Sequence, residues 1–216
     1  MKTRKLFCFS LAVFFCIMCF PLSAQAVCDT SISEAGSINI NELWNSPDVS
    51  ISEPMTYDEL VKRYAQNENI STQQALDILG NDSKSIQPRS IEYRTFTVTL
   101  NVTDEYKPHI EFLCETAESG HFFNLVSIYS VQLVRNYGSV SKQFSGNLEV
   151  WLRSGYDIEY VINGDFYNNG TTTISGGGNL GLGINDSATI GFSASITYQS
   201  NHYAYFYEHE TFHWGY

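Results

Sequence analysis

Three runs of alternating apolar and polar residues lie between Phe144 and Tyr198, a stretch that reads FSGNLEVWLRSGYDIEYVINGDFYNNGTTTISGGGNLGLGINDSATIGFSASITY. The runs cover residues 144–152, 156–166 and 188–198. Successive side chains of a β-strand point to opposite faces, so this alternation predicts strands with one buried face each. We therefore expect three long antiparallel strands.

The register of the first two strands depends on the turn that contains Gly155. If both apolar faces are to lie on one side, opposed residues must have the same parity, which requires a three-residue loop. One such register pairs Val150 with Ile158 and places two glutamates directly opposite each other. The other pairs Trp151 with Glu159 and is favoured, because opposed like charges cost up to about 1 kcal/mol.

The third run has an aliphatic face and an uncharged face of serine, threonine and glycine. Residues 180–184 precede it with the same alternation, so we expect a hairpin that turns at residues 185–187. Tilted strands of about eleven residues can cross a bilayer. The hairpin at 174–198 therefore supports one alternative function, that of a membrane-active, pore-forming or bacteriocin-like protein, although ordinary sandwich strands have the same pattern.

Further alternating runs extend the β pattern from Ile91 to Phe212 and bring the expected total to about seven or eight strands. The buried parity changes near Val126, which predicts a β-bulge. No helix-length segment separates these runs, which favours antiparallel pairing. The sequence therefore predicts a mainly β domain at residues 91–216, built as an antiparallel β-sandwich or barrel.

Two helix-start signals precede the β pattern. Thr56 with Glu59 and Ser71 with Gln74 have the spacing of capping boxes, and Gly80 is a stop signal. We expect residues 27–90 to form an N-terminal arm followed by a short α-helical hairpin. The apolar seam of that hairpin would comprise Leu60, Tyr64, Ala75, Ile78 and Leu79.

Residues 1–26 have the features of a secretory signal peptide. Three basic residues precede an apolar run, and the small-residue pattern Ala24-Gln25-Ala26 follows it. Removal of this segment takes away three of the 12 basic residues and none of the 23 acidic ones, so the formal charge becomes −14. We expect a secreted, extracellular protein, and so acidic a surface argues against nucleic acid as a partner.

Cys28 and Cys114 are the two cysteines outside the predicted signal peptide. In an oxidising compartment such a pair favours a disulfide, which would close a long loop and contribute roughly 4 kcal/mol on the chain-entropy model. We expect this bridge, and lipid attachment at Cys28 is a weaker alternative.

The segment from His209 to His213 reads HETFH and matches the H-E-x-x-H motif of zinc-dependent hydrolases. On a helix, the two imidazoles could share one zinc ion, with Glu210 as the general base. The preceding residues favour a strand, in which the two histidines would lie about 13 Å apart, too far to share an ion. A zinc-dependent hydrolase is therefore the second alternative, and polar residues of a terminal strand are the simpler interpretation.

Two further polar clusters are candidate ligand sites. Asp157 and Glu159 lie near Trp151 on the polar face, an arrangement suited to carbohydrate. A second cluster offers oxygen atoms to Ca²⁺ and comprises Asn163, Asp165, Asn168 and Asn169. Such neighbours are also ordinary turn chemistry.

Four short segments form landmarks of the β region: Ser141-Lys142-Gln143-Phe144-Ser145-Gly146, Ile162-Asn163-Gly164-Asp165-Phe166-Tyr167, Gly170-Thr171-Thr172-Thr173 and Ser200-Asn201-His202-Tyr203. They resemble those of a family of uncharacterised secreted β-rich proteins from Gram-positive bacteria. The resemblance extends from Arg94 to the C-terminus and implies a helical piece ahead of a β domain. It implies no activity and no catalytic residues.

The sequence contains neither a G-x-S-x-G motif nor a phosphate loop, and neither Cys28 nor Cys114 belongs to a C-x-x-C pair. We therefore expect a non-catalytic binding or interaction protein that acts outside the cell or at its surface. The expected partner is an extracellular protein or a glycan, and membrane insertion is not favoured. No cofactor is expected beyond the zinc or calcium considered above.

Overall fold

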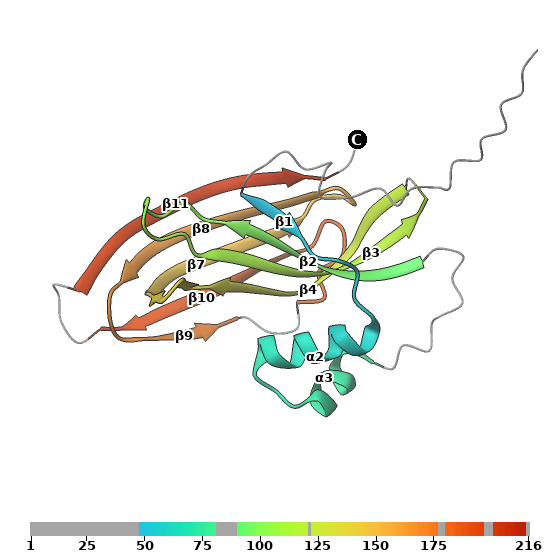
Figure 1. Ribbon diagram of the computed structural model, residues 1–216, viewed down its shortest axis with the longest axis horizontal. Coiled ribbons are helices and arrows are strands. Elements are labelled where there is room, and N and C mark those ends of the chain that lie inside the picture. Colours follow the sequence, from blue (N-terminus) through green and yellow to red (C-terminus); the bar gives the residue numbers. More distant parts are fainter. Residues whose placement is uncertain (1–47, 81–89, 121, 177–179, 197–200, 215–216) are drawn as a thin grey trace, which may run out of the picture. The chain divides into compact units, whose positions relative to one another are not determined.

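The computed structural model describes residues 48–80, 90–120, 122–176, 180–196 and 201–214 (Figure 1). The helices are α2 (Tyr57–Glu68) and α3 (Thr72–Leu79). The strands are β1 (Val49–Ile51), β2 (Ser90–Thr99), β3 (His109–Ser119), β4 (Phe122–Val134), β5 (Asn136–Tyr137), β6 (Val140–Ser141), β7 (Gln143–Leu152), β8 (Asp157–Tyr167), β9 (Thr171–Ser175), β10 (Ser187–Ser195) and β11 (His202–His213). The predicted signal peptide and Cys28 lie outside the described residues.

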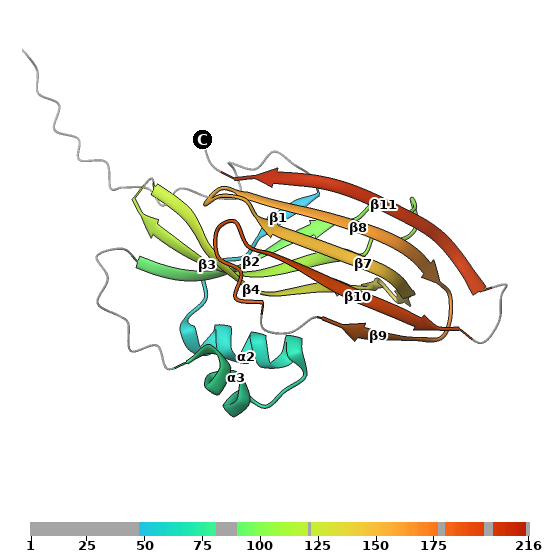
Figure 2. The same ribbon diagram turned by 180° about the vertical axis from the view of Figure 1, so that it is seen from behind.

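The strands form two main antiparallel sheets. One has the order β1-β2-β3-β4 and the other the order β11-β8-β7-β10-β9, while β5 and β6 form a separate two-stranded ribbon (Figures 1 and 2). The prediction of a mainly β, antiparallel, sandwich-like fold with two short helices is confirmed. The strand count is higher than predicted because the short strands β1, β5, β6 and β9 add to the long ones.

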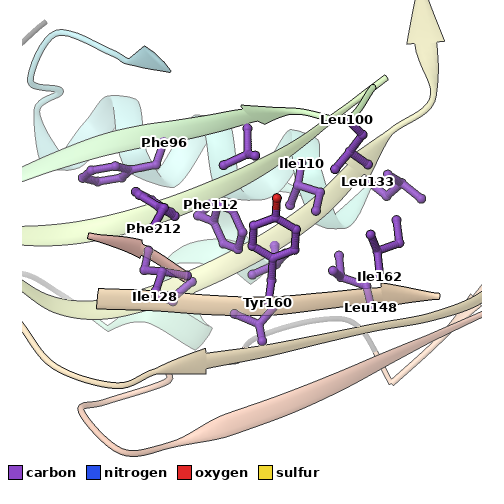
Figure 3. Close-up of a cluster of buried hydrophobic side chains, with 14 of the residues drawn as sticks. Phe96, Leu100, Ile110, Phe112, Ile128, Leu133, Leu148, Tyr160, Ile162 and Phe212 are labelled. Atoms are coloured by element: carbon purple, nitrogen blue, oxygen red, sulfur yellow. The ribbon is translucent and has the colours of Figure 1, made fainter. Parts of the chain in front are cut away.

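The main hydrophobic core lies between the two sheets (Figure 3). Phe96 and Phe112 come from the four-stranded sheet, and Leu148, Tyr160 and Ile162 come from the five-stranded sheet. Each of these side chains is at most 1% exposed. Burial of a large apolar side chain contributes roughly 1.5–3 kcal/mol, so this interface stabilises the whole unit.

The β7–β8 hairpin has the predicted register. Trp151 lies opposite Glu159, and the backbone N–H of Arg153 donates to the carbonyl of Asp157. Gly155 in the turn lies so close to the side chain of Asn124 that a Cβ atom would collide with it. A side chain at position 155 would therefore require the Asn124 side chain of β4 to move.

Two glycines face each other across the same hairpin, since Gly146 lies opposite Gly164. A Cβ atom on Gly164 would collide with the backbone of Ser145 and with the ring of Phe144. The missing side chains thus leave room for Phe144, which is fully buried.

The predicted hairpin between residues 180–184 and the third run is wrong. Strand β10 pairs with β7 on one side and with β9 on the other. Leu182 instead forms a bridge with Ile128 of β4, and it is 5% exposed. The alternation of residues 180–184 therefore reflects contact with the other sheet.

Strand β4 has the predicted bulge. Val126 has no partner in the β3–β4 register, because Glu115 pairs with Ser127 and Thr116 pairs with Leu125. A second irregularity lies at Tyr129. These two interruptions change which residues of β4 face the core.

Both predicted capping boxes are present, at Thr56 with Glu59 and at Ser71 with Gln74. The helices pack on the four-stranded sheet through a second hydrophobic cluster that includes Leu113 of β3. The predicted seam is correct except at Ile78, which is 44% exposed. Helix α3 has only eight residues and buries Ala75 in full, which leaves Ile78 outside the contact.

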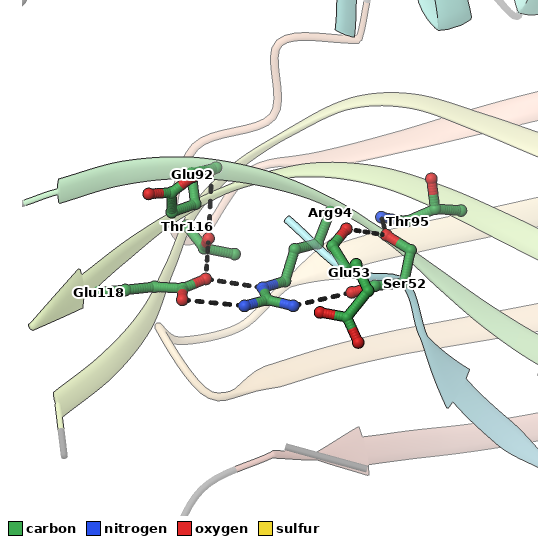
Figure 4. Close-up of polar contacts among 7 residues, drawn as sticks. All are labelled: Ser52, Glu53, Glu92, Arg94, Thr95, Thr116 and Glu118. Atoms are coloured by element: carbon green, nitrogen blue, oxygen red, sulfur yellow. Dashed lines mark hydrogen bonds and ion pairs between the residues drawn. The ribbon is translucent and has the colours of Figure 1, made fainter. Parts of the chain in front are cut away.

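An arginine joins the segment after β1 to the four-stranded sheet (Figure 4). Arg94 of β2 is 6% exposed and donates from Nε and Nη2 to the Glu118 carboxylate of β3. It also donates to the carbonyl of Ser52 at 2.8 Å. Residues 49–51 of the predicted arm pair with β2 and so belong to the four-stranded sheet.

Cys114 is a free cysteine in the core and is 0% exposed. Cys28 lies outside the described residues, so the predicted disulfide between Cys28 and Cys114 stays a prediction. Burial raises the pKa of the Cys114 thiol well above its usual value. A thiol in an apolar core behaves as a small hydrophobic side chain.

Candidate binding site along strand β11

Strand β11 is an edge of the five-stranded sheet and, among the described residues, pairs only with β8 (Figures 1 and 2). Just beyond it, the N–H of Trp214 donates to the carbonyl of Tyr156 at 2.8 Å. In an antiparallel ladder the hydrogen-bonded residues alternate. Even-numbered residues of β11 therefore bond to β8, and the backbone groups of Tyr207, His209 and Thr211 point to the open edge.

Two tyrosines stand side by side on the outer face of this edge strand. Tyr205 is 60% exposed and Tyr207 is 56% exposed. The Tyr205 hydroxyl donates to Oδ1 of Asn163 on β8 at 2.9 Å, so its ring leans across the neighbouring strand. Neighbouring exposed aromatic rings are typical of contact surfaces.

Three histidines of β11 pair with three carboxylates of β8 on the same outer face. Nitrogen–oxygen distances are 2.8 Å for His202 with Asp165, 2.9 Å for His209 with Glu159, and 2.6 Å for His213 with Asp157. The Ser154 hydroxyl and then His213 lower the pKa of Asp157. Arg153 and then His209 lower the pKa of Glu159.

The residues predicted to bind carbohydrate do lie together. Glu159 accepts hydrogen bonds from both Arg153 and His209, and the Arg153 guanidinium lies 4.9 Å from the centre of the Trp151 ring. The carboxylate and one face of the indole are therefore already engaged. A sugar ring would have to displace the guanidinium from that face.

A cavity of about 400 Å³ lies on the inner side of β11, where β11 and β8 approach β1 and β2. Asp48, Glu208 and Glu210 contribute three carboxylates to its lining. The Tyr160 hydroxyl donates to Oε1 of Glu208 at 2.5 Å. Burial raises the pKa of Glu208, and the nearby carboxylates of Glu210 and Asp48 raise it further. Burial and Glu208 also raise the pKa of Tyr160.

The HETFH segment lies in β11, as its strand-forming neighbours predicted. His209 and His213 bind different carboxylates of β8. Glu210 has the opposite parity on the strand and lines the cavity, which His213 also borders. In the part of the chain that the structure describes, no group of three or more His, Cys, Asp or Glu residues could hold a metal ion. The structure does not bring the predicted zinc ligands together.

The predicted calcium ligands are also dispersed. Asn163 and Asp165 lie within β8 and contact Tyr205 and His202. Asn168 Oδ1 accepts a hydrogen bond from Lys142, and Asn169 binds Asn201, so their side chains face other partners.

Part of the segment considered for membrane insertion, residues 174–198, contributes to the core. Ile190 and Phe192 of β10 are 1% and 5% exposed, whereas its serine and threonine side chains face outward. Insertion would require these residues to leave the core. No helix in the described ranges is long and apolar enough to cross a membrane.

Sequence reasoning missed the acidic cavity and the exposed tyrosine pair. One signal was present: Glu208 and Glu210 have the same parity as Phe206 and Phe212, which are buried. Charged residues at apolar-parity positions of a terminal strand indicate an edge whose inner side is open. Asp48 gave no such signal, because it precedes β1, a strand of three residues that is too short to show a period.

Comparison with known proteins identifies no relative of this chain. No protein-family model matches the chain, and neither the curated proteins nor the solved structures contain a significant match. The resemblance to secreted proteins of Gram-positive bacteria therefore stays a prediction.

Proposed function

We propose that this chain is an exported, non-catalytic binding protein whose partner docks along strand β11. The observation that carries the proposal is the adjacent pair Tyr205 and Tyr207. Both are more than half exposed on an edge strand that has no second neighbour among the residues that the structure describes. Tyrosine is enriched at the energetic centres of interfaces, because its ring buries a large apolar area and its hydroxyl keeps a polar contact.

The polar groups around the tyrosines support binding rather than catalysis. The imidazoles of His202, His209 and His213 are each hydrogen-bonded to a carboxylate and spread along one strand. Such pairs fix the orientation of side chains, which lowers the entropy lost when a partner docks. Catalysis would instead need a nucleophile or a base that converges with them on one point.

Export is supported by the signal-peptide pattern at residues 1–26 and by the acidic composition of the remaining chain. We therefore place the proposed partner outside the cell or at its surface.

Site-specific photocrosslinking tests this proposal. A photoreactive benzophenone residue at position 207 would report contacts of β11, and the same residue at Thr173 would report contacts of β9. Thr173 is an exposed position on the opposite edge strand of the same sheet, which makes it a matched control. After incubation with producing cells, we expect discrete adducts from position 207 and not from position 173.

Equal labelling from both positions, or labelling from position 173 alone, would contradict a docking site on β11. Absence of adducts from both positions on intact cells and in culture medium would contradict the binding function itself.

A further inference from the structure

We propose that the partner of β11 is an extended, basic polypeptide segment that adds to the sheet as its next strand. This inference rests on the proposed binding function and names the chemical class of its ligand.

The first step is the open backbone edge. Strand β11 has 12 residues and, in the described part of the chain, uses only one of its two edges for pairing. Tyr207, His209 and Thr211 direct N–H and C=O groups outward, by the alternation derived above. An added strand gains affinity from these main-chain hydrogen bonds.

The second step is the cavity beside that edge. Alternate side chains of an added strand point inward, as those of β11 do. They would extend beside Glu208 and Glu210 toward Asp48, which precedes β1, where the cavity of about 400 Å³ offers space. Neither lysine nor arginine is among the residues that line it. Lysine or arginine side chains of the partner would supply the missing positive charge.

The third step is the exclusion of a second copy as the occupant. Charges that point inward on an edge strand prevent identical edges from pairing, because two such edges would oppose their carboxylates. The formal charge of −11 for the whole chain adds to this repulsion. The same carboxylates would attract the positive side chains of a basic strand. The carboxylates that prevent self-association thus select the partner.

Binding of a labelled 12-residue peptide to the purified protein tests the inference. The probe alternates lysine with threonine, a second peptide alternates glutamate with threonine, and a third alternates lysine with proline. Proline removes backbone N–H groups and disfavours the strand while the charge stays the same. We expect the lysine–threonine peptide to bind at least tenfold more tightly than either of the other two.

Two double variants of the protein distinguish the effect of charge at the cavity on peptide binding from the effect of charge elsewhere. Glu208→Gln with Glu210→Gln removes two carboxylates from the site, and we expect at least a tenfold loss of affinity. Asp58→Asn with Asp77→Asn removes the same charge from exposed positions on helices α2 and α3, and we expect a change of less than about threefold, since screening weakens distant charges.

Four outcomes would overturn the inference. They are equal binding of the lysine–proline peptide, equal losses in the two double variants, no binding of the lysine–threonine peptide, and a dimer of the free protein in sedimentation. If crosslinking at position 207 succeeds while the peptide fails to bind, the binding function stands and the ligand class is wrong. If both fail, the binding function is wrong as well.

Discussion

The hydroxyl of Tyr160, on an inner strand of the five-stranded sheet, donates a 2.5 Å hydrogen bond to the carboxylate of Glu208 on the edge strand. Tyr160 is 1% exposed, so this bond joins the core to the acidic cavity. Glu208 therefore experiences burial on one side and the charges of Asp48 and Glu210 on the other. Ionisation of Glu208 at this edge therefore costs stability.

Replacement of Glu208 by glutamine should stabilise the fold at neutral pH. Because the pKa of Glu208 is higher in the folded than in the unfolded protein, the ionised form destabilises the fold. The advantage of Glu208→Gln should shrink as the pH falls through the raised pKa and vanish below about 4.5, the unfolded value. Urea unfolding of both proteins between pH 4 and 8 measures this difference. A constant difference across that range would show that ionisation of Glu208 has no part in it.

Gly164→Ala should destabilise the protein by about 1–3 kcal/mol, the usual cost of overpacking. The added methyl group would meet the backbone of Ser145 and the buried ring of Phe144. Ser145→Ala, on the facing strand, adds no atoms and serves as the control. Denaturant unfolding measures both, and equal stability of Gly164→Ala and the parent would mean that β7 and β8 are further apart than described.

Ile190→Ala and Ile174→Ala distinguish a sandwich strand from a membrane-inserting hairpin. Ile190 is 1% exposed and Ile174 is 57% exposed. We expect a loss of about 2–5 kcal/mol for Ile190→Ala and a change within about 0.5 kcal/mol for Ile174→Ala. Similar small effects at both positions in thermal or urea unfolding would place β10 outside the core.

Arg94→Ala should cost about 3–5 kcal/mol, because it leaves the Glu118 carboxylate without its partner at a largely buried site. The double variant Arg94→Ala with Glu118→Ala should recover part of this loss. Stability measured over the full double-mutant cycle gives the coupling between the two residues. A coupling near zero would contradict the buried ion pair.

Cys114 should not react with a thiol reagent in the native protein and should react once the protein is unfolded without reductant. Full burial removes access, and the raised pKa keeps the group protonated. Alkylation followed by mass spectrometry measures both states. An unreactive Cys114 in the unfolded, unreduced protein would contradict a free thiol and support the disulfide predicted from the sequence.

Side-chain alternation predicted the long strands well, because one hidden face leaves a period of two in the sequence. The β7–β8 register followed from parity and from one unfavourable charge pair, so local chemistry was sufficient there. Strand β1 has three residues, and β9 reads TTTIS, so neither shows a period. Their pairing depends on distant residues. The predicted partner of residues 180–184 was wrong for the same reason. Alternation indicates that one face of a segment is buried, but it does not identify the strand with which the segment pairs.

The candidate site was less predictable than the fold. The HETFH segment attracted attention as a motif, although its strand conformation separates the two histidines. The acidic cavity depends on Asp48, which is far from Glu208 in the sequence and close to it only in the folded protein. Distances of this kind arise from the packing of two sheets, which a single sequence does not encode as a pattern.

The central claim is that the open edge of β11 accepts a basic strand. Hydrogen exchange of individual β11 amides tests this claim most directly. In the free protein, we expect slow exchange at Glu208 and Glu210 and fast exchange at Tyr207, His209 and Thr211. The lysine–threonine peptide should slow the fast set. Uniform protection of all five amides in the free protein, or no change in the fast set at saturating peptide, would contradict the account.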